Sequence, residues 1–217
     1  TKSPITMNPN KIRIRENNLE FKSITKTQSM LMLLVRQQFR AKMPRSVNSK
    51  FATLLHTIKN EDAEHIRGER TVAAGLRSTF GKQALMDFLF SPDQGVYSLF
   101  GGLPTVSLAG GLCSFRGLFV DVGRFPATAT HIKMQYFVVD YDSTDYNLKP
   151  VYAEKAVVSR DDLTGVLPDF ELLNLSAVGD FRVAYLYVQF CQFHEGAMVD
   201  LSGVGMKGLR CLGVFTS

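Results

Sequence analysis

The 217-residue chain has no tryptophan, only three cysteines and four histidines, and no long apolar run. Its apolar runs, of which Met30 to Val35 is an example, are far shorter than the ~20 residues that a membrane-spanning helix needs. Cys113, Cys191 and Cys211 are odd in number and widely spaced, which fits neither a disulfide scaffold nor a zinc module. We therefore expect no membrane insertion, and a cytoplasmic protein or a particle or filament assembled from cytoplasmic subunits.

Motifs that mark common enzymes are also missing. There is no Gly-x-Ser-x-Gly elbow. Gly203 to Gly208 matches G-x-G-x-x-G, but its surroundings are β-patterned, so we interpret it as a turn before the last strand. His56 and His65 flank an acidic cluster, yet their nine-residue spacing fits no standard helical metal site. The sequence thus indicates no catalytic residues, cofactor, metal or small-molecule substrate, and predicts a protein that is not an enzyme.

Positive charge is concentrated at one end of the chain. The first 59 residues hold twelve Lys and Arg against two acids, Glu16 and Glu20, which gives a charge of +10. The other 158 residues hold thirteen basic and eighteen acidic side chains, which gives −5. A basic region joined to a mildly acidic body indicates a partner, either a polyanion or the acidic face of another copy.

Residues 1–22 are predicted to form an extended basic arm. Lys11 to Arg15 alternate between charged and apolar side chains, which is the period of a β-strand. Such a strand could pair with a sheet edge of its own body or of a neighbouring copy. For the second case we expect Ile12, Arg13, Ile14 and Arg15 to lie at a subunit interface.

Two helices are predicted to follow the arm as a hairpin. Residues 24–42 place apolar side chains at i, i+3 and i+4 spacing, and Pro44 ends the pattern. The second helix begins near Ser46 or Asn48 and continues through Ile58. On the first helix, Arg36 and Arg40 lie off the apolar stripe and are further candidates for the interface.

Beyond a turn signal at residues 91–93, the chain changes to strands punctuated by Gly, Asp, Asn and Pro. The expected strands cover 96–100, 104–109, 113–121, 130–141, 149–158, 181–193 and 206–215. Their number and spacing predict an antiparallel β-sandwich. The fold class is therefore α+β: an N-terminal extended arm (1–22), a helical region (23–93) that contains the hairpin, and a β-sandwich domain (94–217).

Three sequence runs resemble a family of Bacteroidota-type bacterial proteins of undetermined activity. They are Arg13 to Phe21 with its basic ENN-x-E-F segment, Arg67 to Gly75 with its RG-x-R element, and Ala127 to Ile132. The resemblance would span nearly the whole chain. It implies a two-part fold with a β-rich C-terminal half and carries no catalytic residue over to this sequence.

The most direct functional interpretation is a structural subunit that assembles with other copies of itself into a ring, filament, tube or shell. The basic region would contact acidic residues of the body: Asp161, Asp162, Asp169 and Glu171. The alternative is a nucleic-acid-associated coat or packaging protein. Its candidate phosphate-binding residues are Lys22, Lys26, Lys42, Arg45 and Lys50. A third class, a ligand-binding β-domain, depends on exposure of Tyr136, Tyr185 and Tyr187.

Overall fold

The computed structural model describes residues 9–39, 45–91, 95–142, 147–162 and 167–217. Helices come first in the chain: α1 (Pro9–Phe39), α2 (Arg45–Asn60), α3 (Val72–Gly75) and α4 (Thr79–Met86). The strands are β1 (Thr105–Ser107), β2 (Leu112–Ser114), β3 (His131–Asp142), β4 (Asn147–Tyr152), β5 (Ala156–Ser159), β6 (Phe170–Glu171), β7 (Phe181–His194), β8 (Ala197–Asp200) and β9 (Lys207–Thr216). Short 3₁₀ turns are η1 (Gly95–Leu99), η2 (Leu108–Gly110) and η3 (Val122–Arg124). The predicted α+β class is confirmed.

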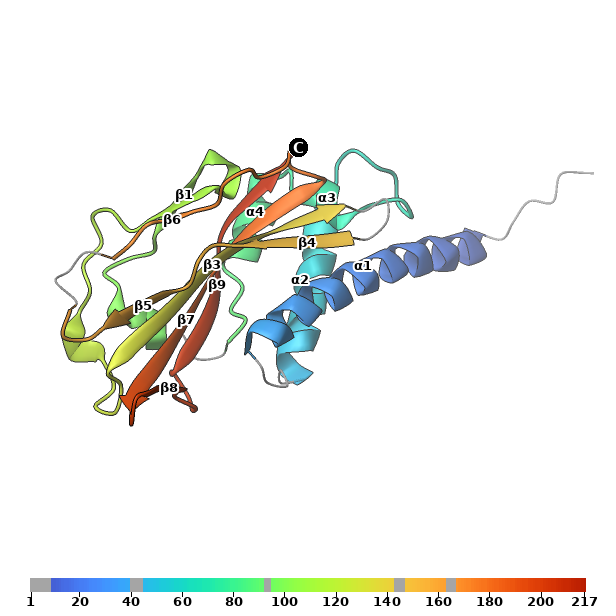
Figure 1. The fold of residues 1–217 in the computed structure, drawn as a ribbon. Coiled ribbons are helices and arrows are strands. Elements are labelled where there is room, and N and C mark those ends of the chain that lie inside the picture. The colour runs from blue at the N-terminus through green and yellow to red at the C-terminus, as the bar shows by residue number, and fades with distance from the viewer. Residues whose placement is uncertain (1–8, 40–44, 92–94, 143–146, 163–166) are drawn as a thin grey trace, which may run out of the picture.

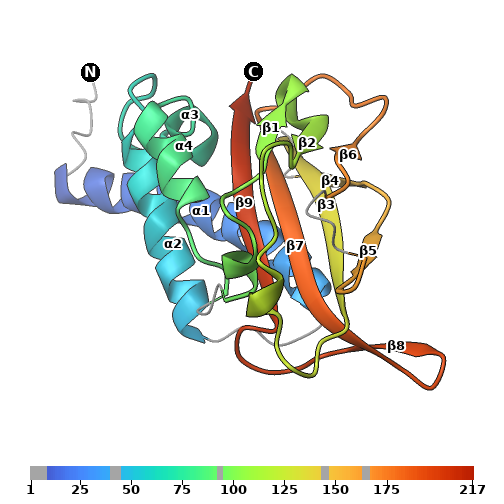
Figure 2. The same cartoon turned by 90° about the vertical axis from the view of Figure 1, so that its left-hand side faces the viewer.

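A curled, six-stranded antiparallel sheet forms the centre of the molecule. Strand β7 lies between β3 and β9, β4 and β5 both pair with β3, and β8 pairs with the end of β7. Figure 2 shows the helices on one side of this sheet and the small β1–β2–β6 sheet on the other. The central sheet therefore has a hydrophobic core on each of its faces.

Alternation along the long strands supplies both cores. On β3, Phe137 and Val139 face the helices, whereas Tyr136 and Val138 face the small sheet, and all four are buried. The same alternation continues on β7, where Tyr185 faces the helices. Because both faces are covered, these strands are nearly continuous apolar runs, and for this reason their sequence signal is strong.

The expected β-sandwich is not confirmed. In the described residues the second sheet has three short strands, and helices cover the face of the central sheet that lies opposite to it. The strands predicted at 130–141, 181–193 and 206–215 agree with β3, β7 and β9. Residues 95–99 form the 3₁₀ turn η1 instead of a strand. The domain boundary predicted at 91–93 falls mostly outside the described residues.

The extended arm predicted for residues 1–22 is wrong for residues 9–22, which form the first part of α1. Residues 1–8 lie outside the described part of the chain. Pro9 suits the first turn of a helix, and no Gly or Pro interrupts the sequence from Asn10 to Phe39. The helical backbone satisfies its own hydrogen bonds, so residues 9–22 cannot add to a sheet edge as a strand.

The predicted helical hairpin is confirmed for α1 and α2, although α1 begins well before residue 24. Ile24, Leu31 and Val35 of α1 and Phe51 and Leu55 of α2 are buried in the core between the helices and the sheet. Among the described residues, no helix is both long and apolar enough to span a bilayer.

Candidate subunit interface on helix α1

The two halves of α1 have different surroundings. The C-terminal half packs on the sheet and α2, whereas the N-terminal half extends beyond the sheet (Figure 1). Four large apolar side chains on the extending half are exposed to solvent: Ile12 (39%), Ile14 (60%), Leu19 (52%) and Phe21 (59%). At 100° per residue, Ile12 and Leu19 lie on one side of the helix and Ile14 and Phe21 lie on nearly the opposite side. The four residues therefore form two exposed pairs, and the Phe21 ring also lies 5.8 Å from the His56 ring of α2.

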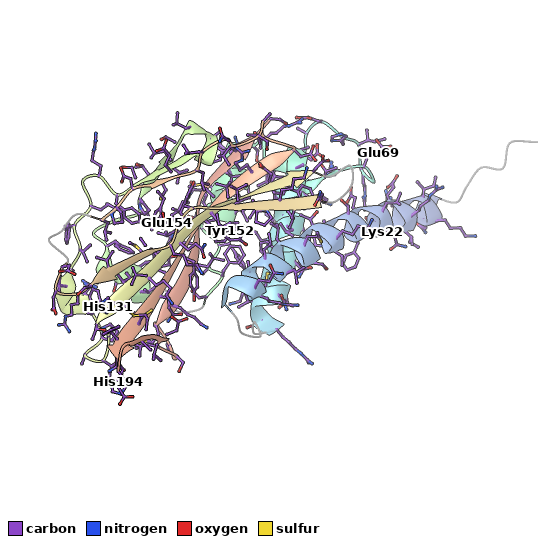
Figure 3. All side chains as sticks on the ribbon, in the orientation of Figure 1. Lys22, Glu69, His131, Tyr152, Glu154 and His194 are labelled. Atoms are coloured by element: carbon purple, nitrogen blue, oxygen red, sulfur yellow. The ribbon has the colours of Figure 1, made fainter. Side chains whose placement is uncertain are left out.

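Basic side chains form one ridge on the same half of α1. Lys11, Arg15, Lys22 and Lys26 are all exposed and are spaced at i, i+4, i+11 and i+15. With 3.6 residues per turn, this spacing places them within a narrow stripe along the helix. Figure 3 labels Lys22 on the part of α1 that extends beyond the sheet. Lys22 follows the buried Glu20 by two residues, which is about 200° around the helix, so the two side chains lie on opposite sides. The ridge therefore faces away from the body.

A buried ion pair fixes the inner side of α1 to the end of α2. Lys59 Nζ lies 2.5 Å from Glu20 Oε2, and the Gly68 N–H donates to Glu20 Oε1 at 2.8 Å. Burial alone would raise the pKa of Glu20. The hydrogen bonds from Lys59 and Gly68 outweigh it, so the pKa of this carboxyl is below its ordinary value. Glu20 thus holds α1, α2 and the following loop together as a charged group.

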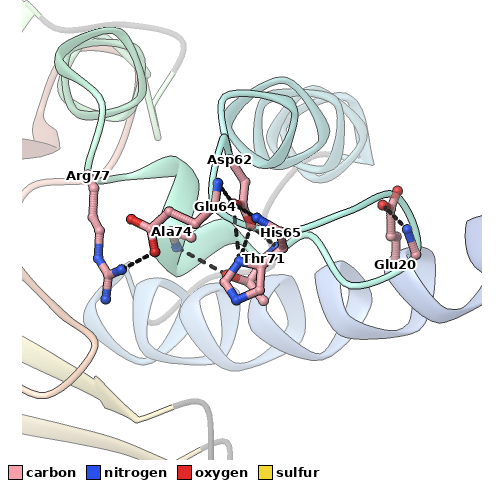
Figure 4. Close-up of polar contacts among 8 residues, drawn as sticks. Glu20, Asp62, Glu64, His65, Thr71, Ala74 and Arg77 are labelled. Atoms are coloured by element: carbon pink, nitrogen blue, oxygen red, sulfur yellow. Dashed lines mark hydrogen bonds and ion pairs between the residues drawn. The ribbon is translucent and has the colours of Figure 1, made fainter.

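The loop after α2 is organised around the buried carboxylate of Asp62 (Figure 4). Its Oδ1 accepts the N–H groups of Glu64 and His65 at 2.9 and 3.0 Å. Its Oδ2 accepts the Thr71 N–H at 2.8 Å and lies 2.9 Å from His65 Nδ1. Burial opposes ionisation, but these donors lower the pKa of Asp62. Structural hydrogen bonding thus accounts for the histidine and acid cluster noticed in the sequence.

The same loop also touches the extending half of α1 directly. Arg67 donates to Asn17 Oδ1 at 2.9 Å. Gly68 has a φ of +96°, and a Cβ at this position would lie 2.9 Å from Glu16 Cγ. A glycine is required both by the left-handed backbone and by this close approach. Residues 16–20 are therefore anchored, and the exposed ridge is held in a defined orientation.

The structure places the predicted interface residues on α1, but not as one compact group. Ile12, Arg13, Ile14 and Arg15 are exposed on the extending half, on a helix instead of the expected strand. Arg36 is exposed near the other end, about 30 Å along the axis from Arg15 at 1.5 Å per residue. Arg40 lies outside the described residues.

The predicted phosphate-binding residues divide in the same way. Lys22 and Lys26 lie on the exposed ridge of α1, whereas Arg45 and Lys50 are exposed on α2. Lys42 lies outside the described residues. The ridge therefore brings Lys22 and Lys26 together with Lys11 and Arg15, and not with the cations of α2.

Sequence reasoning missed the exposed Leu19 and Phe21 as candidate interface residues. They follow Ile12 and Ile14 by seven residues each, which is two helical turns, so each pair lies on one side of α1. That signal is present in the sequence. It was hidden because the short alternation from Lys11 to Arg15 favours a strand when taken by itself.

The tyrosines named for a ligand-binding surface do not form one. Tyr136 and Tyr185 are buried in opposite cores, and only Tyr187 is partly exposed. That interpretation is therefore wrong in the form predicted.

In comparisons with known proteins, no family model, curated protein or solved structure matches this chain. The resemblance to the Bacteroidota-type family stays a prediction.

Proposed function

We propose that the protein is a non-enzymatic structural subunit that associates with other copies of itself through the extending half of α1. The observation that carries this proposal is the set of four large apolar side chains, each 39% to 60% exposed, on a helix that extends beyond the body. The ion pair between Glu20 and Lys59 holds that helix in place within a single copy of the chain. The surface is thus preorganised for contact, which lowers the entropic cost of association.

A protein partner accounts for the apolar residues better than a polyanion does. Full burial of a Leu, Ile or Phe side chain contributes about 1.5 to 3 kcal/mol, so covering one half-exposed pair, such as Ile14 and Phe21, supplies a few kcal/mol. Contacts to phosphate groups would use the cations and leave Ile14 and Phe21 in water. The mixture of apolar and basic residues therefore favours a protein surface with acidic groups.

Charge complementarity supports a second copy as that partner. The first 59 residues carry +10, and the rest of the chain carries −5. Four acids of the body are exposed: Asp161, Asp162, Asp169 and Glu171. A contact between α1 of one copy and the body of the next is head-to-tail, so it either closes into a ring or continues as a filament or shell.

The alternative is a nucleic-acid-associated coat or packaging role. The observation that favours it is the ridge of Lys11, Arg15, Lys22 and Lys26, four exposed cations in one stripe that can neutralise several phosphates. Binding of this kind weakens steeply with salt, with a slope set by the number of phosphates contacted.

Substitution of the apolar side chains tests the proposal. We expect Ile14→Ser combined with Phe21→Ser to reduce the assembly measured by sedimentation velocity to small species. A matched control is Leu173→Ser combined with Val204→Ser, since these residues are 71% and 82% exposed on loops of the body. Equal assembly of both variants and the parent chain would refute the proposed surface, provided that both variants stay folded.

A further inference from the structure

The helix-facing side of the central sheet changes character along its length. Phe137, Val139 and Tyr185 are buried under the helices, but the next residues outward on the same face, Gln135 on β3 and Tyr187 on β7, are polar and partly exposed. These two are cross-strand partners in the sheet register. The polar end of the sheet is therefore only partly covered by the helices, and Gln37 of α1 lines the space over it.

One row of this surface carries two lysines on either side of a glutamine. The register pairs Lys133 with Gln189 and Gln189 with Lys207, so the three side chains stand next to one another across β3, β7 and β9. Neighbouring strands are about 4.8 Å apart, which places the two lysine Cα atoms about 10 Å apart. A small anion between them would reach both ammonium groups.

The glutamine at the centre of this row is held in place by hydrogen bonds. Gln189 is 2% exposed, and its Nε2 donates to the carbonyl oxygens of Phe190, Leu201 and Met206 at 2.7 to 3.1 Å. Its Oε1 accepts from the Tyr187 hydroxyl at 2.8 Å. Both the amide and the phenol are therefore fixed before any ligand arrives, as a binding site requires.

A cavity of about 450 Å³ lies over this row. Its other walls include Tyr152 and Lys155, which come from the end of β4 and the turn after it, and Asp200 at the end of β8. The Tyr152 ring packs on Phe137 with a centroid distance of 5.3 Å, which fixes its position. The volume is in the range of pockets that hold small organic ligands.

The charges in the cavity define the ligand. Lys133, Lys155 and Lys207 supply three positive charges, and Asp200, which lies 2.5 Å from Lys133 Nζ, supplies one negative charge. The net charge of +2 matches the dianion of a phosphate monoester, whose second pKa is about 6. Two tyrosine rings and the Gln135 amide are suited to the organic group that the phosphate is attached to.

We propose that this cavity, lined by Lys133, Lys155, Lys207, Tyr152 and Tyr187, binds a small phosphate monoester. The phosphate lies between the lysines, and the organic group lies against the tyrosines. The ligand is a nucleoside monophosphate or a sugar phosphate, two sources of the same chemistry. This site is separate from the proposed assembly surface on the extending half of α1, so either proposal can fail without the other.

Calorimetric titration of the purified full-length chain tests the site. The probes are inorganic phosphate, a hexose 6-phosphate and a nucleoside 5′-monophosphate, each paired with its unphosphorylated form where one exists. We expect one of the two organic monoesters to bind more tightly than inorganic phosphate, and the unphosphorylated forms not to bind. The better monoester identifies the organic group.

Two lysine variants test whether the phosphate monoester binds in this cavity. Lys207→Gln and Lys155→Gln each remove one charge-assisted contact and should weaken binding about tenfold. Lys149→Gln is the matched control, because Lys149 is exposed. It is the cross-strand neighbour of Asp140 in the sheet register and lies on the opposite face of the sheet. Absence of binding by all three phosphate probes to the folded chain, or equal weakening by Lys149→Gln, would overturn the proposal.

Discussion

Lys59 and Glu20 form an ion pair in the interior, with 2.5 Å between Nζ and Oε2 and with 8% and 6% of their side chains exposed. The pair connects the end of α2 to the middle of α1. Because Glu20 also accepts the Gly68 N–H, one carboxylate joins three segments of the chain. The orientation of the proposed assembly surface depends on this contact.

Breaking this pair from one side should be costly. We expect Glu20→Gln to lower the free energy of unfolding by about 3 to 5 kcal/mol, since it leaves the Lys59 ammonium buried without a counter-charge. The combined Glu20→Gln and Lys59→Met variant should lose less than Glu20→Gln alone. Chemical denaturation measures all three chains. Arg124→Gln is the control, because its pair with Asp121 is exposed and should contribute at most about 1 kcal/mol.

Acid should destabilise the protein through Glu20 and Asp62. Both have a folded-state pKa below their ordinary values of 4.5 and 3.8, because hydrogen bonds to the carboxylates outweigh the burial that opposes ionisation. The stability they contribute is therefore present above those ordinary values and is lost as the pH falls through the lower folded-state values.

The Asp62→Asn variant isolates the contribution of Asp62 to the pH dependence of stability. We expect its stability to fall less steeply than that of the parent chain between about pH 5 and about pH 3. Denaturation midpoints at several pH values provide the measurement. Identical slopes for the two chains would contradict the assigned role of Asp62.

The three cysteines should be unreactive in the folded protein. Cys113, Cys191 and Cys211 are free and buried, and burial raises the pKa of each thiol from 9.0 to about 12. The thiolate is the reactive form, so alkylation at pH 8 should be slow in the native state and complete in denaturant. Rapid labelling of any of the three under native conditions would show that its strand opens readily.

Gly75 should not tolerate a side chain. A Cβ at this position would lie 1.9 Å from the Ile58 carbonyl oxygen, where α3 meets the backbone of α2. We expect Gly75→Ala to lower the free energy of unfolding by about 3 kcal/mol, because backbone has to move. Gly102→Ala is a suitable comparison, since its Cβ would meet only Leu118 Cδ2, at 3.1 Å. Similar stability of these two variants would argue against the close packing of α3 on α2.

The sequence predicted the long strands well because burial on both faces makes them apolar over most of their length. In β7, every residue from Phe181 to Leu186 is buried. The same approach failed at Lys11 to Arg15, where the apolar side chains are exposed and their alternation therefore says nothing about burial. The absence of Gly and Pro was the better indication of a helix there, since neither occurs between Asn10 and Phe39.

The candidate sites were harder to predict than the strands. Charge counting located the basic helix, because cations close in sequence stay close on one helix. The cavity proposed to bind phosphate combines Lys133, Lys155 and Lys207, which are brought together only by the register of β3, β7 and β9 and the turn after β4. No local pattern in the sequence marks such a group.

The most direct test of self-assembly is the solution mass of the purified, nuclease-treated chain, measured by light scattering at physiological salt. One copy has a mass of 24.2 kDa. Self-association through α1 predicts a mass that is a multiple of this value and that decreases on dilution or on substitution of Ile14 and Phe21. A monomer at all concentrations would contradict the proposed structural role.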